Sequence, residues 1–131
     1  MKEIKIGASF EATTIVNSTN TAITAGSGSL SVFGTPFLIA LMEKATCDAV
    51  SDFLEDGETT VGTAINISHS KASGIGTVVT AKAVISACSG RKITFDVSAT
   101  DGNGDIIGSG TIERFAVLAD KFMKKVESHE I

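Results

Sequence analysis

Three polar side chains in the middle of the chain have the types that hydrolytic sites use: Thr35, Glu43 and His69. A carboxylate or an imidazole can activate water or attack a carbonyl carbon, and a hydroxyl can orient either group. Free N–H groups at a helix start can stabilise an oxyanion. Each residue also has an ordinary role, since inward histidines are more often core residues and threonines often cap helices. The combination favours a hydrolytic site, although spacing alone does not identify the reaction.

Glu43 lies in the one strongly helical stretch of the chain, from Pro36 to Leu54. At 3.6 residues per turn, one line of this helix carries Ile39, Glu43, Cys47, Val50 and Leu54. A carboxylate inside such an apolar line loses solvation, which raises its pKa and makes it a functional candidate. The alternative is that Glu43 lies at the edge of the apolar line, paired with Lys44 or with solvent.

The two ends of this helix carry recognisable signals. Thr35 is predicted as the N-cap, followed by Pro36 at the first helical position, where a missing N–H costs nothing. Gly57 suits a left-handed cap after the helix. Along the helix axis Thr35 and Glu43 are about 12 Å apart, at ~1.5 Å per residue. Their side chains therefore meet only through a second subunit or through a different start of the helix.

The rest of the chain predicts an antiparallel sheet. Residues 10–23 favour a strand, and a loop of small residues follows at 25–29. After the helix the period changes to two, which predicts four consecutive strands joined by short turns, near 59–69, 78–87, 92–99 and 105–117. In the first of these, Val61, Ile65, Ile67 and His69 share one face. A helical tail begins at Leu118. The predicted fold class is α+β, with the sheet wrapped around one long central helix in a single domain, 1–131.

Composition excludes several classes of function. The net charge is −4, basic clusters are absent, and Trp and Tyr do not occur, which argues against nucleic acid as a partner. No apolar run approaches the roughly 20 residues that a membrane helix needs, so no membrane partner is expected. Met1 to Lys5 is charged and no apolar run follows, so no signal peptide is predicted and the expected location is the cytoplasm. Cys47 and Cys88 have no metal-site spacing and are expected to be buried or unreactive thiols.

Two sequence blocks carry a family resemblance. The first is VFGTPFLIALMEKA at 32–45, in which a Thr-Pro helix opening is followed by a glutamate eight residues after the threonine. The second is GETTVGT at 57–63, whose strand continues to a histidine seven residues after the second glycine. Together they resemble the hotdog-fold thioesterases, specifically the fluoroacetyl-CoA thioesterase group. The resemblance covers residues 32–117 and implies a hotdog fold.

The resemblance implies roles for individual residues. Thr35, Glu43 and His69 match the catalytic threonine, carboxylate and histidine of the group. Gly62 matches a glycine whose backbone lies near the thioester, and Phe33 and Gly34 are expected to bind substrate with it. The implied reaction is hydrolysis of an acyl-CoA to free acid and CoA, with no cofactor and no metal. The implied assembly is a homodimer whose sheets join edge to edge, with active sites at the subunit boundary.

One segment departs from the group. The type enzyme carries a phenylalanine-bearing lid before the helix, whereas residues 26–31 here are small and polar apart from one leucine. This difference argues against selection of a fluoroacetyl group and favours another short or medium acyl-CoA. The alternatives are a hotdog hydratase, whose helix-loop signature is absent, and a non-catalytic acyl-CoA binding or sensing module. Candidate contacts for the CoA phosphates are Lys71, Lys82, Arg91 and Lys92.

Overall fold

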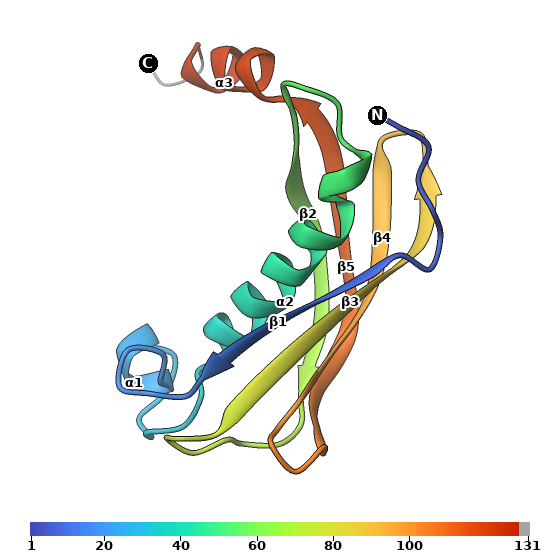
Figure 1. Cartoon of the computed structure of the whole chain (residues 1–131). Coiled ribbons are helices and arrows are strands. Elements are labelled where there is room, and N and C mark those ends of the chain that lie inside the picture. Colours follow the sequence, from blue (N-terminus) through green and yellow to red (C-terminus); the bar gives the residue numbers. More distant parts are fainter. Residues whose placement is uncertain (129–131) are drawn as a thin grey trace.

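The long helix α2 (Thr35–Val50) lies in the hollow of a curved, five-stranded antiparallel sheet (Figure 1). The computed structural model describes residues 1–128. The strands are β1 (Ser9–Ile15), β2 (Glu58–His69), β3 (Val78–Ser89), β4 (Lys92–Thr100) and β5 (Ile106–Leu118). A short helix α1 (Ala22–Ala25) precedes α2, a 3-10 turn (Ser51–Phe53) extends it, and α3 (Ala119–Glu127) follows β5. The predicted sheet around a central helix is confirmed, as is the helical tail.

The strand order is β1-β3-β4-β5-β2. Strands β3, β4 and β5 follow one another through short turns as predicted, but β2 does not pair with β3. It pairs with β5 over Glu58 to His69, at the opposite edge of the sheet. Residues 70–77 therefore connect the edge strand β2 to β3, past β5 and β4, which lie between them in the sheet. The prediction that all four strands pair in sequence order is wrong for the first of them. Both β1 and β2 are edge strands.

The core follows from alternating residues on β3 and β4. The inward positions of these strands are buried: Val79, Ala81, Ala83 and Ile85 on β3, and Ile93, Phe95, Val97 and Ala99 on β4. Fully burying a side chain of the size of Ile or Phe contributes about 1.5–3 kcal/mol relative to leaving it exposed. The alanines have little side chain to separate the sheet from α2, so the helix can lie deep in the hollow.

The buried side of α2 differs from the predicted apolar line. It is formed by Leu38, Leu41, Met42, Ala45, Thr46, Ala49 and Val50. Val50 is the one member of the predicted line on this side, whereas Ile39 and Glu43 are half-buried and Cys47 is exposed. Glu43 is therefore a margin residue whose side chain is 33% exposed. Cys47 and Cys88 are both exposed, so burial, one of the two alternatives predicted for them, is wrong.

Three local boundaries also differ from prediction. The first strand ends at Ile15, because Asn17 and Asn20 form a turn through a bond from the Asn17 N–H to the Asn20 side chain. The residue capping α2 is Gly34, and Gly57 takes its positive φ of 82° in the turn before β2. Within residues 1–128, no helix is long and apolar enough to span a membrane.

Candidate functional site

The start of α2 and the end of β2 meet at one end of the sheet. Oγ1 of Thr35 lies 2.7 Å from Nδ1 of His69, within hydrogen-bond distance. Thr35 does not cap the helix, because the Gly34 carbonyl accepts the N–H groups of Phe37 and Leu38 and the Thr35 side chain makes no capping bond. The hydroxyl is therefore free to pair with the histidine. The structure brings together two of the three predicted catalytic residues.

A β-bulge in β2 decides which side chains face the helix. Gly62 pairs with Arg114 and Ala64 pairs with Glu113, so Thr63 is an extra residue without a partner. A bulge shifts the alternation of side chains by one position. Val61 therefore lies on the opposite face from His69, contrary to the prediction, and Gly62 takes the inward position instead.

The surroundings of His69 favour the neutral form of its imidazole. Burial lowers the pKa of His69, and the neighbouring Lys71 backbone offsets part of this effect. Its Nε2 atom is buried and has no hydrogen-bond partner among the described residues. A cavity of about 230 Å³ borders Thr35 and His69, and Phe33 and Ser27 contribute to its lining. A neutral imidazole beside a cavity can accept a proton or orient a bound molecule.

The two other predicted substrate-binding residues in this region have different surroundings. Phe33 is 1% exposed and packs in the core as well as lining the cavity. Gly34 faces the loop before α1, because a Cβ on Gly34 would lie 3.0 Å from the Thr21 carbonyl oxygen and 3.1 Å from the Ala22 nitrogen. Gly34 is therefore required for close approach of the chain, and it does not line the cavity.

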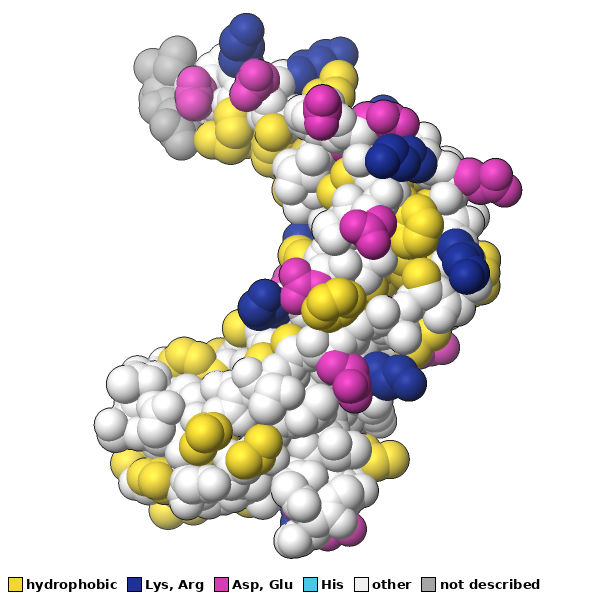
Figure 2. All heavy atoms as spheres, in the orientation of Figure 1, with side chains coloured by type: hydrophobic (Ala, Val, Ile, Leu, Met, Phe, Trp, Pro, Cys, Tyr) yellow, Lys and Arg dark blue, Asp and Glu magenta, His cyan; other side chains and the backbone are white. Residues whose placement is uncertain are grey.

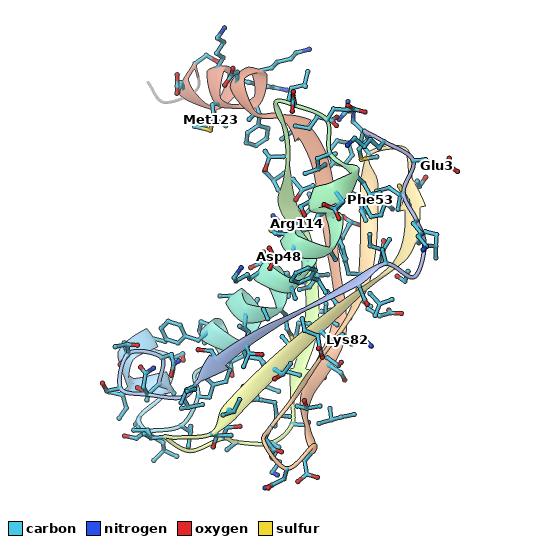
Figure 3. The ribbon with its side chains drawn as sticks, in the orientation of Figure 1. Glu3, Asp48, Phe53, Lys82, Arg114 and Met123 are labelled. Carbon is cyan, nitrogen blue, oxygen red and sulfur yellow. The ribbon has the colours of Figure 1, made fainter. Side chains whose placement is uncertain are left out.

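The carboxylate of Glu43 is held by an arginine from β5. Nη1 of Arg114 donates to Oε2 of Glu43 at 3.2 Å. The same guanidinium donates through Nε to the Thr60 hydroxyl at 2.8 Å and through Nη2 to the Thr60 carbonyl at 3.1 Å. Figure 3 shows Arg114 beside α2. The alternative that Glu43 lies at the edge of the apolar line is therefore confirmed, but its partner is Arg114 and not Lys44, which pairs with Asp48 at 3.1 Å.

Gly62 provides the space in which this carboxylate lies. A Cβ at Gly62 would come within 3.0 Å of Oε2 of Glu43 and 3.6 Å of Nη1 of Arg114. The backbone of β2 therefore passes directly beside the carboxylate. Glu43, Gly62 and Arg114 therefore form a second cluster, distinct from the Thr35–His69 pair.

The two groups are separate within one chain. His69 lies seven residues beyond Gly62 in β2, which corresponds to about 23 Å at ~3.3 Å per residue. The structure thus pairs Thr35 with His69, and Glu43 with Gly62, without joining the pairs. No group of three or more His, Cys, Asp or Glu side chains within residues 1–128 could hold a metal ion.

Arg114 is the residue that the sequence prediction missed. The signal was present: Ile112, Arg114 and Ala116 alternate along β5, and all three are buried. A cation at an inward position of a strand needs a partner, because charged groups are rarely buried unless paired. That reasoning would have indicated a carboxylate opposite Arg114.

Three of the four lysine and arginine candidates for binding CoA phosphates already have ion-pair partners. Lys71 lies 2.7 Å from both Asp101 and Asp105. Arg91 pairs with Glu58 at 3.1 Å, and Lys92 lies 3.8 Å from Glu113. The fourth, Lys82 on β3, forms no ion pair with a described residue, although it lies opposite Glu11 of β1 in the strand register.

Comparison with known proteins places this geometry in a family. A family model described as fluoroacetyl-CoA-specific thioesterase matches residues 16–120. A fluoroacetyl-CoA thioesterase from Streptantibioticus cattleyicolor is 44% identical over 95 residues, which cover 72% of this chain and 68% of that protein.

Solved structures agree with this match. A structure of the fluoroacetyl-CoA thioesterase FlK superposes with a TM-score of 0.92 at 34% identity, covering 99% of this chain and 100% of FlK. A thioesterase superfamily member from Thermus thermophilus has a TM-score of 0.91 at 24% identity, covering 98% of this chain and 94% of that one, and shows the fold alone. The chain therefore belongs to the fluoroacetyl-CoA-specific thioesterase family of thioester hydrolases, and its curled sheet around α2 is the hotdog fold.

Proposed function

We propose that the protein hydrolyses a short or medium acyl-CoA at a site formed by two copies of the chain. Thr35 and His69 come from one subunit, and Glu43 with the backbone of Gly62 comes from the other. The observation that carries this proposal is the position of β2. This strand carries His69 at its end and Gly62 seven residues earlier, one in each half of the site. It is also an unpaired edge strand of the sheet.

The composition of β2 supports pairing with a second copy. The strand has 12 residues, and from Thr59 to His69 it contains no Asp, Glu, Lys, Arg or Pro. Soluble proteins usually protect long edge strands with charge or proline, so an unprotected edge favours pairing. In addition, the face of the molecule between α1 and α3 is hollowed (Figure 2).

Symmetry then brings the separated groups together. A two-fold axis perpendicular to the sheet pairs β2 with its copy in antiparallel fashion and keeps both α2 helices on one face. The end of one β2 then lies against an earlier part of the other. This arrangement moves the Thr35–His69 pair of one subunit toward Glu43 and Gly62 of the partner subunit.

The chemistry has two routes that use the same atoms. In one, the Glu43 carboxylate takes a proton from water while the water oxygen attacks the thioester carbonyl carbon. In the other, the carboxylate attacks directly and forms an anhydride, which water then hydrolyses. In both, the C–S bond breaks, CoA leaves as a thiolate and takes up a proton. Thr35 and His69 orient the reacting groups, and N–H groups near Gly62 stabilise the oxyanion, which is typically worth ~3 kcal/mol.

The segment before α2 supports an acyl group other than fluoroacetyl. Ser27 lines the cavity beside Thr35 and His69, and Leu30, the one large apolar residue of 26–31, is 67% exposed. No aromatic side chain of this segment covers the cavity. An uncovered cavity provides less contact for selecting one small halogenated group and accepts longer chains.

Release of free thiol from a panel of acyl-CoAs tests the proposal, from acetyl to about decanoyl with fluoroacetyl included. We expect turnover of short or medium members that falls by about 100-fold or more in Glu43→Gln, the scale of losing a catalytic acid or base. Glu11→Gln, on an exposed position of β1, serves as the matched control and should keep full activity. No turnover of any member, with CoA esters still bound, would instead identify a non-catalytic binding module.

A further inference from the structure

The loop between β2 and β3, residues 70–77, is joined to the hairpin between β4 and β5 by one lysine. Nζ of Lys71 donates to Oδ2 of Asp101 and to Oδ2 of Asp105, each at 2.7 Å. The two aspartates lie 30 and 34 positions further along the chain, so these ion pairs connect segments that are distant in sequence. Figure 1 shows the loop and the hairpin at the same end of the sheet.

The hairpin side of these ion pairs is fixed by its own hydrogen bonds. The Asp101 side chain is 7% exposed, and its Oδ1 accepts the backbone N–H groups of Asn103 at 2.9 Å and of Asp105 at 3.1 Å. The bond from Lys71 is the main cause that lowers the pKa of Asp101, and burial offsets part of this effect. The bonds to both aspartates raise the pKa of Lys71. The pair of Lys71 and Asp101 therefore stays charged at neutral pH.

The loop side of these ion pairs is attached to both His69 and Thr35. Lys71 comes two residues after His69 and borders the cavity beside that imidazole. Further along the loop, the Ser73 carbonyl accepts the N–H of Phe33 at 2.8 Å, two residues before Thr35. The same loop thus contacts both segments that bring Oγ1 of Thr35 and Nδ1 of His69 to 2.7 Å.

The start of the loop is attached to β5 at a single atom. The N–H groups of Ser70 and Lys71 and the Ser70 hydroxyl share one acceptor, the Ile107 carbonyl, at 2.8, 3.2 and 3.3 Å. Bonds to one oxygen set the distance of the loop from the strand but allow the loop to turn about that oxygen. The bonds from Lys71 to two carboxylates supply a second point of attachment, which fixes the orientation of the loop.

We infer that Lys71 is a positioning residue of the proposed site. Its ion pairs with Asp101 and Asp105 hold residues 70–77 in the orientation in which the side chains of His69 and Thr35 meet. Because its ammonium is engaged by the hairpin, Lys71 acts through the loop backbone and not on the substrate. The inference rests on the proposed function for the role of His69 in hydrolysis, whereas the effect on the imidazole can be measured without substrate.

A double variant that conserves net charge separates position from charge. Lys71→Met/Asp101→Asn removes one positive and one negative charge, and the new amide keeps the oxygen that accepts the two hairpin N–H groups. We expect kcat for thiol release to fall about tenfold with little change in KM, because the reacting groups are misplaced. The matched control is Lys44→Met/Asp48→Asn, which removes an ion pair of the same composition from α2 and should keep wild-type kcat.

The titration of His69 provides a readout that does not depend on turnover. Burial is the main cause that lowers the pKa of His69, and the loop forms one wall of the cavity beside the imidazole. Release of the loop should admit water and raise this pKa toward its ordinary value of about 6.5. Apart from His69, Lys71 is the titratable side chain among the described residues that borders this cavity. NMR titration of both double variants in a His129→Gln background measures the shift.

Two single variants keep the test decisive if the double variant does not fold. Asp105→Asn, at a side chain that is 61% exposed, removes one of the two bonds to Lys71. Loss of a negative charge alone would lower the pKa of His69, so the rise that we expect in this variant would report position and not charge. Lys71→Arg supplies donors for both carboxylates and should retain the wild-type kcat and titration.

Each other result has a definite meaning. An unchanged His69 titration in Lys71→Met/Asp101→Asn, or the same losses in the α2 control, would overturn the role of Lys71 and leave the proposed hydrolysis standing. A shifted titration with unchanged kcat would also overturn that role, because the loop position would then not matter for turnover. If the wild-type protein hydrolysed no thioester while the double variant still shifted the titration, the proposed function would be overturned and the positioning of His69 by Lys71 would be supported.

Discussion

Arg114 and Glu43 are joined at 3.2 Å across the space between β5 and α2, 71 positions apart in the chain. The arginine is 7% exposed and is fixed from the other side by both oxygens of Thr60. The carboxylate, in contrast, is 33% exposed, so one oxygen is anchored while the group remains accessible. This arrangement holds the Glu43 carboxylate in one orientation without enclosing it.

Replacing Arg114 by lysine should separate positioning from charge. Lysine keeps the positive charge, but a single ammonium cannot donate in the fixed geometry that reaches Thr60 and Glu43 together. We expect kcat to fall about tenfold or more with little change in KM, the pattern of a lost transition-state interaction. The free energy of unfolding should fall by about 1–3 kcal/mol, because buried hydrogen bonds are lost. Steady-state kinetics and urea unfolding measure the two effects.

The neighbouring threonine offers a second check on the same idea. Thr60→Val removes the hydroxyl that accepts from Nε of Arg114, so it should reproduce part of the loss in kcat. Thr59→Val, at the adjacent exposed position, is the control and should leave kcat unchanged. Full activity in Arg114→Lys would show that Glu43 needs no anchor.

Substituting Gly62 by alanine should impair the site while sparing the fold. The new methyl group would meet Oε2 of Glu43 at 3.0 Å and Nη1 of Arg114 at 3.6 Å, both at the ends of side chains that can move. The carboxylate would then shift by a few tenths of an ångström, and misplacement on this scale can reduce turnover about tenfold. Thermal unfolding and thiol-release kinetics should show a nearly unchanged Tm with reduced kcat.

Gly108 provides the contrast for that substitution. A Cβ at Gly108 would lie 2.8 Å from the Ser68 carbonyl oxygen and 3.0 Å from the Leu38 side chain, in backbone and core that cannot move freely. Gly108→Ala should therefore lower Tm markedly. If Gly62→Ala instead lowered Tm as much as Gly108→Ala does, the glycine would be structural and our placement of the carboxylate beside it would be wrong.

The lowered pKa of His69 predicts a pH dependence with a definite sign. Burial is the main cause, so the imidazole stays neutral to a lower pH than an unperturbed histidine with a pKa of about 6.5. If neutral His69 is the active form, activity should persist below pH 6.5 and fall as pH drops through the lowered pKa. An NMR titration of His69 in a His129→Gln background measures this pKa directly, because the chain has two histidines.

Stability should follow the same group. The unfolded chain protonates His69 at a higher pH than the folded chain does, so the unfolded state binds more protons below about pH 6.5. The free energy of unfolding therefore falls as pH decreases from that value toward the folded pKa, and this part of the dependence should vanish in His69→Asn. A titration midpoint at or above 6.5 in the folded protein would contradict the burial argument.

The parts of the fold that could be predicted from the sequence are those set by local alternation. On β3 as far as Ile85, and along β4, buried residues recur at every second position, so the alternation shows directly which face is inward. Beyond Ile85 a bulge shifts the register of β3, and Ala87, which the alternation placed on the inward face, is exposed. The same reasoning failed on β2, because the bulge at Thr63 depends on how the strand pairs with β5. Partner choice is a long-range property, which also explains why β2 was wrongly placed beside β3.

The candidate site was predictable to a similar extent. The types Thr35, Glu43 and His69 and their sequence blocks were sufficient to indicate the chemistry and the family. Arg114, which anchors Glu43, could not be predicted in the same way, because a cation within a strand is easily interpreted as an outward residue. Only the pairing of Gly62 with Arg114 places the arginine opposite the Glu43 carboxylate. The separation of the two halves was anticipated from the helix length alone.

Mixed dimers provide the most direct test of a site shared between subunits. Thr35→Ala and Glu43→Gln remove residues from the two halves, and each variant alone should be nearly inactive. A mixed dimer carrying one variant in each subunit keeps one site with both residues intact and loses both residues from the other site. Mixed dimers isolated with two affinity tags should therefore recover about half of the wild-type kcat per dimer. The control mixes Thr35→Ala with His69→Asn. Because both residues come from the same subunit of each site, each of the two sites then lacks one of them, and no activity should be recovered. A single-chain site predicts no recovery in either mixture, because every subunit then carries a broken site.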